Sequence, residues 1–485
     1  MSRSLRPLTT FISPQEMSSL SYVPVEPYSA DSDWRYRAEG GANIVISMPH
    51  QGRVLRFPKT AHAEPIQVAR LRRLADYRNF VIAPLLGELG GSPWQVVRLS
   101  EEDRRRLATD IEPSRPPRRR GNAINPGGLA LKMDDCAVFP SPAAPLAPPT
   151  APPHVFSVEI KAKQGFLCAD DDLGVCSFCM KQYLKLKRGT VQQVSGYCPL
   201  DLFSGEFDRF DRALRSLLDS PQNNLRVFLD GEFVYGAGAR GDRDQLLDAV
   251  AEVMAERRPP QADRLLKLWT RLMFTVLCTN DSQSVLQEEE EDEESCRPAG
   301  CCVPGAGLPP RSFLGRVLRG QRLAAAGPTQ TSQLLDQMTA AEPNRVEEAF
   351  RTPFSDPLWT RVVADADIEP VDALEALQRY SIGATMRDAS LMITMRRASD
   401  GEVDAGLRQV TDSAGHRWVV LCRLMDLDPK HVRRVSRQRL KKEKSKELYL
   451  RARHPRGEAN RGVPIPCSVS DEGIDHLLAV SGSPM

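Results

Sequence analysis

The chain has 485 residues, of which 41% are hydrophobic and 26% charged, and its formal net charge is +2. These values are ordinary for a soluble globular protein, and the length allows one large core or two lobes. The sequence lacks an apolar run of about 18 residues and a signal peptide, so we expect no membrane span and a location in the cytoplasm and nucleus. The 11 cysteines are odd in number and irregularly spaced, which argues against a disulfide framework.

The first lobe is predicted to begin with a hairpin. Residues 1–33 are polar with scattered Pro and Ser, so we expect a flexible tail, with order starting near Trp34. Asn43–Met48 and Arg53–Phe57 are predicted strands, and Pro49–Gly52 joins them.

A helix that Pro65 opens follows this hairpin, since apolar residues recur there with helical spacing. The stretch Pro140–Pro153 is rich in Pro and Ala and predicts a linker or a surface loop. We therefore place a smaller first lobe at 34–153, a larger second lobe at 154–470 and a tail at 471–485.

The second lobe is predicted to open with a strand at Val155–Lys163. Side chains of a strand alternate between its two faces, so Glu159, Lys161 and Lys163 are expected on one face. An Asp-Gly turn at 230–231 predicts another hairpin further along.

A disordered insertion is predicted at residues 282–330, which are acidic at first and then rich in Gly, Pro and Cys. Helices are expected from about Gln333 to Tyr380. Two strands follow, Leu391–Met395 and Trp418–Leu424, and a polar loop joins them.

Two aspartates flank these last strands. Asp388 lies just before the first strand and Asp426 just after the second, so antiparallel pairing would bring both carboxylates to one end of the ladder. Phosphoryl transfer uses one aspartate to accept the hydroxyl proton and another to hold magnesium, for which Asp428 is a second candidate. Two unrelated loop aspartates that cap turns are the alternative, and the spacing alone favours it.

The segment 39–43 reads EGGAN and leads into the first hairpin. Small residues there let backbone N–H groups approach phosphate oxygens closely. The segment lacks the P-loop pattern, and a turn between strands is typical of the lid over the nucleotide in kinases. Arg56 on the returning strand is placed to reach a phosphate, although a purely structural hairpin explains the glycines equally well.

Basic residues form a third candidate group. A ligand that carries many phosphates needs many cations, because point charges and guanidinium forks neutralise it together. The candidates are Arg119, Lys161, Lys163, Lys185, Lys430 and Arg434, with Asn223 and Asn224 as neutral donors. Solvated surface lysines are the alternative for each. The longer basic segment 430–456 is also a candidate for RNA binding.

Several enzyme classes are excluded by missing motifs. Zinc hydrolase motifs of the HExxH type, the serine hydrolase motif GxSxG, and the HRD and DFG motifs of protein kinases are all absent. Cys176 and Cys179, with Cys198 nearby, form a weak zinc signal without a fourth ligand. Buried reduced thiols are the favoured interpretation.

Taken together, these stretches resemble the inositol-pentakisphosphate 2-kinase family over about residues 34–450. The resemblance rests on motifs in the family's order: EGGAN at 39–43, VLR at 54–56, VEIKAK at 158–163, GFL at 165–167, CPLDLFSG at 198–205, PQNN at 221–224, ATMRDASLMI at 384–393 and DLDPK at 426–430.

The resemblance implies an α+β, two-lobed, kinase-like fold of the inositol polyphosphate kinase type, with ATP between the lobes. It implies a monomer that uses ATP and Mg²⁺ to phosphorylate the 2-hydroxyl of inositol pentakisphosphate. Asp388 matches the catalytic base and Asp426 the magnesium ligand. The positions that match nucleotide contacts are Gly40, Gly41, Ala42, Asn43, Arg56 and Glu159. The positions that match substrate contacts are Arg119, Lys161, Lys163, Lys185, Asn223, Asn224, Lys430 and Arg434.

The sequence departs from the family pattern at four positions. Ser177 stands in place of a substrate-binding Arg, Gln438 in place of a Tyr, Arg387 in place of a Lys and Gln164 in place of a Cys. Loss of one phosphate-binding Arg costs about 1.5–3 kcal/mol. A non-catalytic relative that binds a polyphosphate or RNA therefore stays open, as does a kinase for a less phosphorylated inositol.

A zinc site of the Cys/His type found in plant members has no clear counterpart in this sequence. Cys296, Cys301 and Cys302 lie in the predicted insertion. The presence of zinc is therefore left open.

Overall fold

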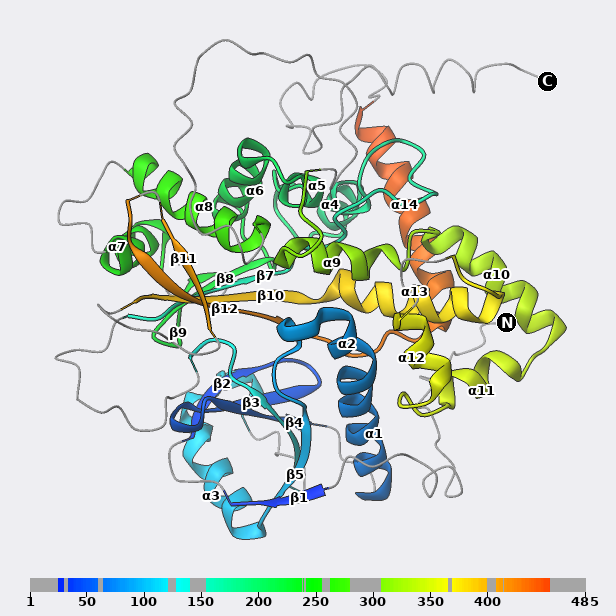
Figure 1. Cartoon of the computed structure of the whole chain (residues 1–485), viewed down its shortest axis with the longest axis horizontal. Helices are drawn as coiled ribbons and strands as arrows, with labels where there is room; N and C mark the ends of the chain where they lie inside the picture. Colours follow the sequence, from blue (N-terminus) through cyan, green and yellow to red (C-terminus); the bar gives the residue numbers. More distant parts are fainter. Residues whose placement is uncertain are drawn as a thin grey trace. The chain divides into compact units, whose positions relative to one another are not determined.

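The computed structural model describes residues 25–29, 34–59, 64–120, 128–139, 154–237, 239, 241–254, 262–279, 307–364, 369–398, 407–412 and 414–453. The chain divides into two compact units (Figure 1). Unit 1 comprises Met1–Val81, Gly91–Asp135 and Thr352–Thr360, and unit 2 comprises Ile82–Gly90, Cys136–Arg351 and Arg361–Met485. Among the described helices, none is both long and apolar enough to cross a membrane.

Unit 1 is built on a six-stranded sheet with the order β1-β5-β6-β4-β3-β2. Only the pair of β1 and β5 is parallel. The strands are β1 Val25–Tyr28, β2 Arg35–Glu39, β3 Asn43–Met48, β4 Arg53–Pro58, β5 Gln95–Leu99 and β6 Leu129–Asp134. The helices are α1 Glu64–Asp76 and α3 Glu101–Ile111, with short turns η1 Pro49–Gln51, η4 Glu112–Ser114 and η5 Pro117–Arg119. A helical turn, η2 Tyr77–Ile82, leads from α1 toward unit 2.

The predicted hairpin of unit 1 is confirmed as β3 and β4. Alternation puts Ile44 and Ile46 of β3 fully inside, where they join a core that Leu107 and Ile111 of α3 close. Ser100 caps α3 by accepting a hydrogen bond from the backbone N–H of Asp103 at 3.0 Å, as N-cap residues do.

The prediction of a flexible tail over residues 1–33 is wrong for β1, Val25–Tyr28. Val25–Tyr28 pairs in parallel with β5, so order begins before Trp34 within the described residues. Local composition carries no sign of this pairing, because the partner strand lies far along the chain. Unit 1 also takes up Thr352–Thr360, in which the ring of Phe354 packs 4.8 Å from that of Tyr77. The units therefore differ from the contiguous lobes that the sequence predicts.

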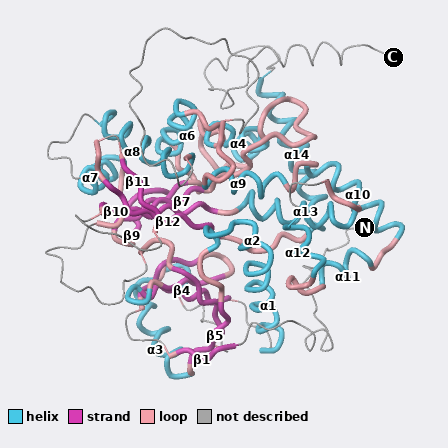
Figure 2. The backbone as a smooth tube through the Cα atoms, in the orientation of Figure 1, coloured by secondary structure: helices cyan, strands magenta, loops and turns pink. Residues whose placement is uncertain are grey.

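Unit 2 contains a second six-stranded sheet, which is antiparallel throughout and has the order β11-β12-β10-β7-β8-β9. Its strands are β7 Phe156–Ile160, β8 Leu225–Leu229, β9 Glu232–Gly236, β10 Ser390–Arg397, β11 Arg408–Thr411 and β12 Arg417–Met425. Figure 2 shows them drawn together as one group of strands with helices beside it. Helix α8 packs on β7, where the rings of Trp269 and Phe156 meet edge to face at 6.0 Å.

The helices of unit 2 are α2 Ala83–Leu86, α4 Ser177–Lys187, α5 Pro199–Leu202, α6 Phe207–Asp219, α7 Arg243–Met254, α8 Ala262–Cys278, α9 Phe313–Arg322, α10 Gly327–Ala341, α11 Arg345–Arg351, α13 Ala373–Asp388 and α14 Val435–Arg453, with turns η3 Gly87–Gly90 and η6 Val432–Arg434. Helix α12 Pro357–Ala364 begins in unit 1 and ends in unit 2. The mixed α+β class is therefore confirmed.

Two predictions for unit 2 need correction. The first strand ends at Ile160, and Lys163 has a positive φ of 62°, so Glu159, Lys161 and Lys163 do not share one strand face. The disordered insertion is wrong beyond residue 306, because α9 and the start of α10 lie there and Leu314 of α9 is fully buried. The Gly and Pro content of this segment suggested disorder and hid the short apolar stripe of α9. Residues 280–306 and the predicted linker at 140–153 lie outside the described residues.

Gly205 lies where two distant segments of unit 2 meet. Its φ is +78°, and a Cβ added to it would lie 2.6 Å from the backbone carbonyl carbon of Gly307. Gly189 has a similar φ of +64°, but a Cβ added there would meet nothing within 4 Å. An alanine at Gly205 would meet both backbone strain and steric overlap, whereas an alanine at Gly189 would meet backbone strain alone.

We expect Gly205→Ala to lower the free energy of unfolding by about 3 kcal/mol, since strain and overlap add. Gly189→Ala is the matched control and should cost only about 1 kcal/mol, from the strained φ alone. Urea unfolding followed by far-UV circular dichroism measures both. Equal losses for the two variants would show that the backbone at 307 yields to the added methyl group.

Candidate functional site

The ends of three strands meet in unit 2. Strand β10 pairs antiparallel with β12, with Ser390 opposite Met425, and with β7, with Leu391 opposite Ile160. Asp388 ends α13 just before β10, and Asp426 follows β12 directly. The predicted meeting of the two carboxylates at one end of the ladder is confirmed, and Lys161 leaves β7 at the same end.

Asp388 is held by lysines. The Nζ of Lys430 lies 2.7 Å from its Oδ2, and the Nζ of Lys163 lies 3.9 Å from its Oδ1. Partial burial raises the pKa of Asp388, but the hydrogen bond from Lys430 and the charges of Lys163 and Lys161 outweigh burial, so the pKa is lowered overall. Asp388 is therefore ionised at neutral pH and oriented by its partners, as a proton acceptor must be.

Asp426 sits in a strained backbone conformation with a φ of 59°. Its Oδ2 accepts hydrogen bonds from Nζ of Lys161 at 2.5 Å and from Oγ of Ser390 at 3.4 Å. Such left-handed residues cluster at functional sites, where the surrounding structure holds them in place. Its side chain is 53% exposed, so an incoming group has access to the carboxylate. Carboxylate oxygens of this kind are the ligands that Mg²⁺ prefers, and Asp428 follows two residues later.

Lysines crowd around this pair of aspartates. The pKa of Lys163 is lowered to about 8, first by burial; the charge of Asp388 raises it, and the charges of nearby lysines, Lys161, Lys181 and Lys185, lower it. On helix α4, burial also lowers the pKa of Lys185, and the nearby charge of Lys181 acts in the same direction. Clustered like charges raise the free energy of the empty site, and a polyanion relieves that cost.

Asn224 is a buried polar residue that lacks a partner for its side chain. It is 1% exposed, and within the described residues neither its Oδ1 nor its Nδ2 makes a hydrogen bond. Its backbone carbonyl accepts from the N–H of Lys161 at 2.8 Å, which places it beside the lysine cluster. Buried polar groups almost always have partners, so the amide of Asn224 is suited to bind a ligand. Asn223 is exposed.

Unit 1 holds the glycine-rich turn between β2 and β3. A Cβ added to Gly40 or Gly41 would meet nothing within 4 Å, so packing does not explain these glycines. The side chain of Arg119 donates to the carbonyl of Gly40. With the amide of Asn43 turned so that its oxygen faces Arg56, it accepts from Arg56 Nη2 at 2.8 Å. Four predicted residues are thus brought together around an open turn.

A buried ion pair supports this turn. The carboxylate of Glu39 has no exposed surface, and Arg115 Nη2 lies 3.2 Å from it, with Lys59 as a second partner. Burial raises the pKa of Glu39, but hydrogen bonds from Arg115 and Lys59 outweigh it and lower the pKa. The pair anchors the end of β2 from which the turn starts.

Glu159 and Arg434 are the remaining predicted contact residues, and they differ in burial. Glu159 on β7 is buried, with Arg226 at 3.5 Å, and its predicted contact with the nucleotide stays a prediction. Arg434 in η6 is exposed. The roles of the other matched residues likewise stay predictions.

The departures from the family pattern contact one another. Arg387 donates to Oε1 of Gln164 at 2.9 Å, and its guanidinium lies 5.1 Å from the ring centre of Tyr380. The hydroxyl of Tyr380 donates to Oε1 of Gln438 at 2.5 Å. Ser177 donates to Asp171 at 3.2 Å, and Gln164 donates to the other oxygen of the same carboxylate at 3.4 Å, so all four substituted positions belong to one network.

The basic helix α14 is partly neutralised. Lys442 lies 2.8 Å from Asp170 and 2.6 Å from Asp171, and Lys446 pairs with Asp172. These cations hold α14 against the acidic loop before α4. RNA binding by segment 430–456 stays a prediction, and residues 454–456 lie outside the described chain.

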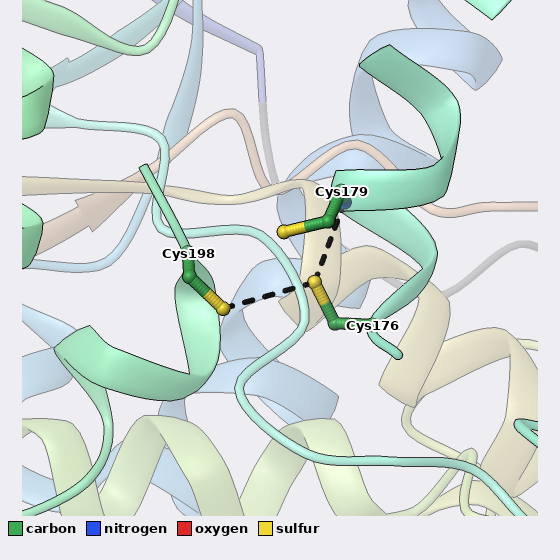
Figure 3. A group of neighbouring side chains, drawn as sticks. All are labelled: Cys176, Cys179 and Cys198. Atoms are coloured by element: carbon green, nitrogen blue, oxygen red, sulfur yellow. Dashed lines mark hydrogen bonds between the residues drawn. The ribbon is translucent and has the colours of Figure 1, made fainter. Parts of the chain in front are cut away.

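Three buried cysteines lie side by side (Figure 3). Their sulfur atoms all lie within 4.8 Å of one another, and Cys176 and Cys198 are 4.0 Å apart. Structural zinc sites use four ligands, and the described His, Cys, Asp and Glu residues supply only these three. The thiol of Cys179 donates to the carbonyl of Tyr197 at 3.9 Å, which suits a reduced thiol.

We expect these cysteines to be reduced and free of metal. A thiol reagent added to the denatured protein, without chelator or reductant, should label Cys176, Cys179 and Cys198, as located by peptide mass spectrometry. Zinc measured by plasma mass spectrometry should stay far below one per chain. A ratio near one that Cys198→Ser abolishes would establish a metal site instead.

Lys181 is the residue that the sequence interpretation missed. It lies one helical turn before Lys185 on α4, and the i, i+4 spacing of these lysines was a usable signal. Ser177 lies one helical turn before Lys181, so the three residues follow one another along the same side of α4.

The depressed pKa of Lys163 is open to measurement. At pH 8 roughly half of its amine is uncharged, against about 0.3% for a lysine at the ordinary value. Competitive acetylation at a series of pH values, with mass spectrometry, should give a reactivity midpoint near 8 for Lys163. Added inositol hexakisphosphate should shift that midpoint upward, because bound phosphate favours the charged form. A midpoint above 10 in the free protein would contradict the burial argument.

Comparison with known proteins supplies a family. The model for the inositol-pentakisphosphate 2-kinase family matches residues 36–445. Inositol-pentakisphosphate 2-kinase of Danio rerio is 28% identical over 469 residues, which cover 87% of this chain and 94% of that protein. The corresponding enzyme of Oryza sativa subsp. japonica is 26% identical over 443 residues, which cover 82% of this chain and 89% of that one.

Proposed function

Since the chain belongs to the inositol-pentakisphosphate 2-kinase family, we propose that it transfers the γ-phosphate of ATP to the 2-hydroxyl of inositol 1,3,4,5,6-pentakisphosphate. The product is inositol hexakisphosphate. The observation that carries the proposal is the pair Asp388 and Asp426 at one end of the β10–β12 ladder, surrounded by lysines.

The acceptor hydroxyl would be oriented by Asp388. Lys430 holds one carboxylate oxygen at 2.7 Å, which leaves the other, with only Lys163 at 3.9 Å, to accept the hydroxyl hydrogen. The carboxylate takes up the proton as the oxygen attacks phosphorus. Positioning and charge neutralisation carry most of the acceleration, because phosphoryl transfer needs little covalent help from the protein.

The polyphosphate would be held by Lys161, Lys163, Lys185 and Asn224. Asp426 would hold Mg²⁺, which supplies charge neutralisation on the transferring phosphate when bound. For Asp426 to bind a cation, Lys161 must exchange its carboxylate partner for a phosphate. That exchange costs little, since ion pairs with a half-exposed partner contribute about 0–1 kcal/mol.

The nucleotide phosphates would lie against the glycine-rich turn of unit 1, with Asn43 and Arg56 as side-chain contacts and ATP between the two lobes of a kinase-like fold. A non-catalytic polyphosphate binder is less well supported. Carboxylates that face phosphates repel them, so a protein that only binds a polyphosphate gains no affinity from Asp388 and Asp426.

The test is transfer of labelled γ-phosphate from ATP to inositol pentakisphosphate by the purified protein. We expect wild type to form the hexakisphosphate, and Asp388→Asn to lower kcat about 10²–10⁴-fold because the proton acceptor is lost. Binding of the inositol phosphate should survive in this variant.

Asp230→Asn is the matched control, because it removes an exposed turn carboxylate of the same unit. It should leave kcat unchanged. Binding without turnover by wild type would favour the non-catalytic alternative. If the protein phosphorylates only a less phosphorylated inositol, the kinase assignment stands but inositol pentakisphosphate is not its substrate.

A further inference from the structure

We infer that Lys181 and Lys441 form a further phosphate-binding pair beside the reacting centre, which holds a phosphate of the inositol polyphosphate other than the transferred one. The inference rests on the proposed function, since it concerns the substrate of the same site.

The first observation is where the two lysines lie. Lys181 stands on α4 and Lys441 on α14, and these helices pack together, with the rings of Tyr183 and Tyr449 meeting edge to face at 5.4 Å. The charge of Lys441 acts directly on Lys181. Lys181 lies one turn from Lys185 and one turn from Ser177, which bonds to Asp171, the partner of Lys442 on α14.

The second observation is that neither ammonium group is neutralised by a described residue. Lys442 and Lys446 on the same helix α14 both pair with aspartates of the loop at 170–172. Lys181 and Lys441 form no ion pair with the described acids. Helix α14 thus carries cations that fix its position and others, Lys441 among them, that no described acid holds.

The third observation is the charge around Lys181. Its pKa is lowered, first by burial and then by the charge of Lys441, with Arg188 and Arg387 acting in the same direction and Asp388 against them. Cations exceed acids among these groups, so the arrangement is repulsive until an anion enters. A phosphate group supplies the missing charge and three acceptor oxygens.

The fourth observation is that the lysines nearest the two aspartates are already paired with them. Lys161 is paired with Asp426, and Lys163 and Lys430 both lie against Asp388. A ligand with five phosphates therefore needs cations beyond those that the aspartates hold. Lys181 and Lys441 meet that need at the edge of the cluster.

The test compares Lys181→Ala and Lys441→Ala with Lys187→Ala, a matched control on the exposed end of α4. Lys187 lies six residues from Lys181 and therefore on another side of the helix. Each test variant should raise KM for inositol pentakisphosphate and weaken hexakisphosphate binding by calorimetry about tenfold. The values of kcat and KM for ATP should stay within about twofold, because the phosphate held here does not react.

Two further variants sharpen the result. The double variant should lose less than the product of the single effects, because both lysines hold the same phosphate. Lys181→Arg should keep the affinity of wild type, since a guanidinium at the same position retains the charge and the donors.

Thermal melting should show that all variants fold. If both single variants match Lys187→Ala in binding and in KM, the pair is merely solvated and the inference is overturned. If wild type fails to make hexakisphosphate while Lys181→Ala still weakens its binding, the phosphate pair stands and the proposed function falls.

Discussion

The antiparallel ladder of β10 with β12 and β7 is the constraint on which the reacting centre depends. Its register places Ser390 opposite Met425 and Leu391 opposite Ile160, so β10 begins at the end where β7 and β12 stop. Asp388 precedes β10, and Lys161 and Asp426 follow β7 and β12, so all three residues lie at this end. A slip of one residue in either pairing would turn every side chain of a strand to the other face, so the register fixes the chemistry of this end.

Two kinds of ion pair serve different purposes in the two units. The pair of Arg115 and Glu39 in unit 1 is almost fully buried, so its loss would leave an uncompensated charge inside, and the pair acts as a permanent anchor. The aspartates of unit 2 are about half exposed, at 55% for Asp388 and 53% for Asp426. Their ion pairs are weak enough to exchange partners when phosphates arrive.

The acidic loop before α4 explains how a strongly basic helix is tolerated beside a lysine cluster. Asp170 and Asp171 neutralise Lys442, so the charge of this lysine no longer adds to the repulsion. The loop also holds Ser177 through Asp171. Lys442 and Lys446, which are paired with aspartates, therefore hold α14 in place. The lysines without an acidic partner are the ones available to a polyanion.

By itself, the sequence determined features whose causes are local. The hairpin of β3 and β4 follows from alternation and a turn of suitable residues, and the strands that flank Asp388 and Asp426 follow from the same patterns. The order of short motifs identified the family, which the comparisons confirm. Most of the candidate residues could be named on that ground.

Only the tertiary structure decided which charges meet. β1 and α9 escaped prediction because they are held by partners far along the chain, and the strand at Lys163 ends early because the backbone turns there. For Lys181 the sequence offers only its i, i+4 spacing to Lys185, whereas the influence of Lys441 on it arises because α14 packs on α4. Electrostatic interactions depend on distance in space, and strand register and helix packing set that distance through contacts that local composition does not encode.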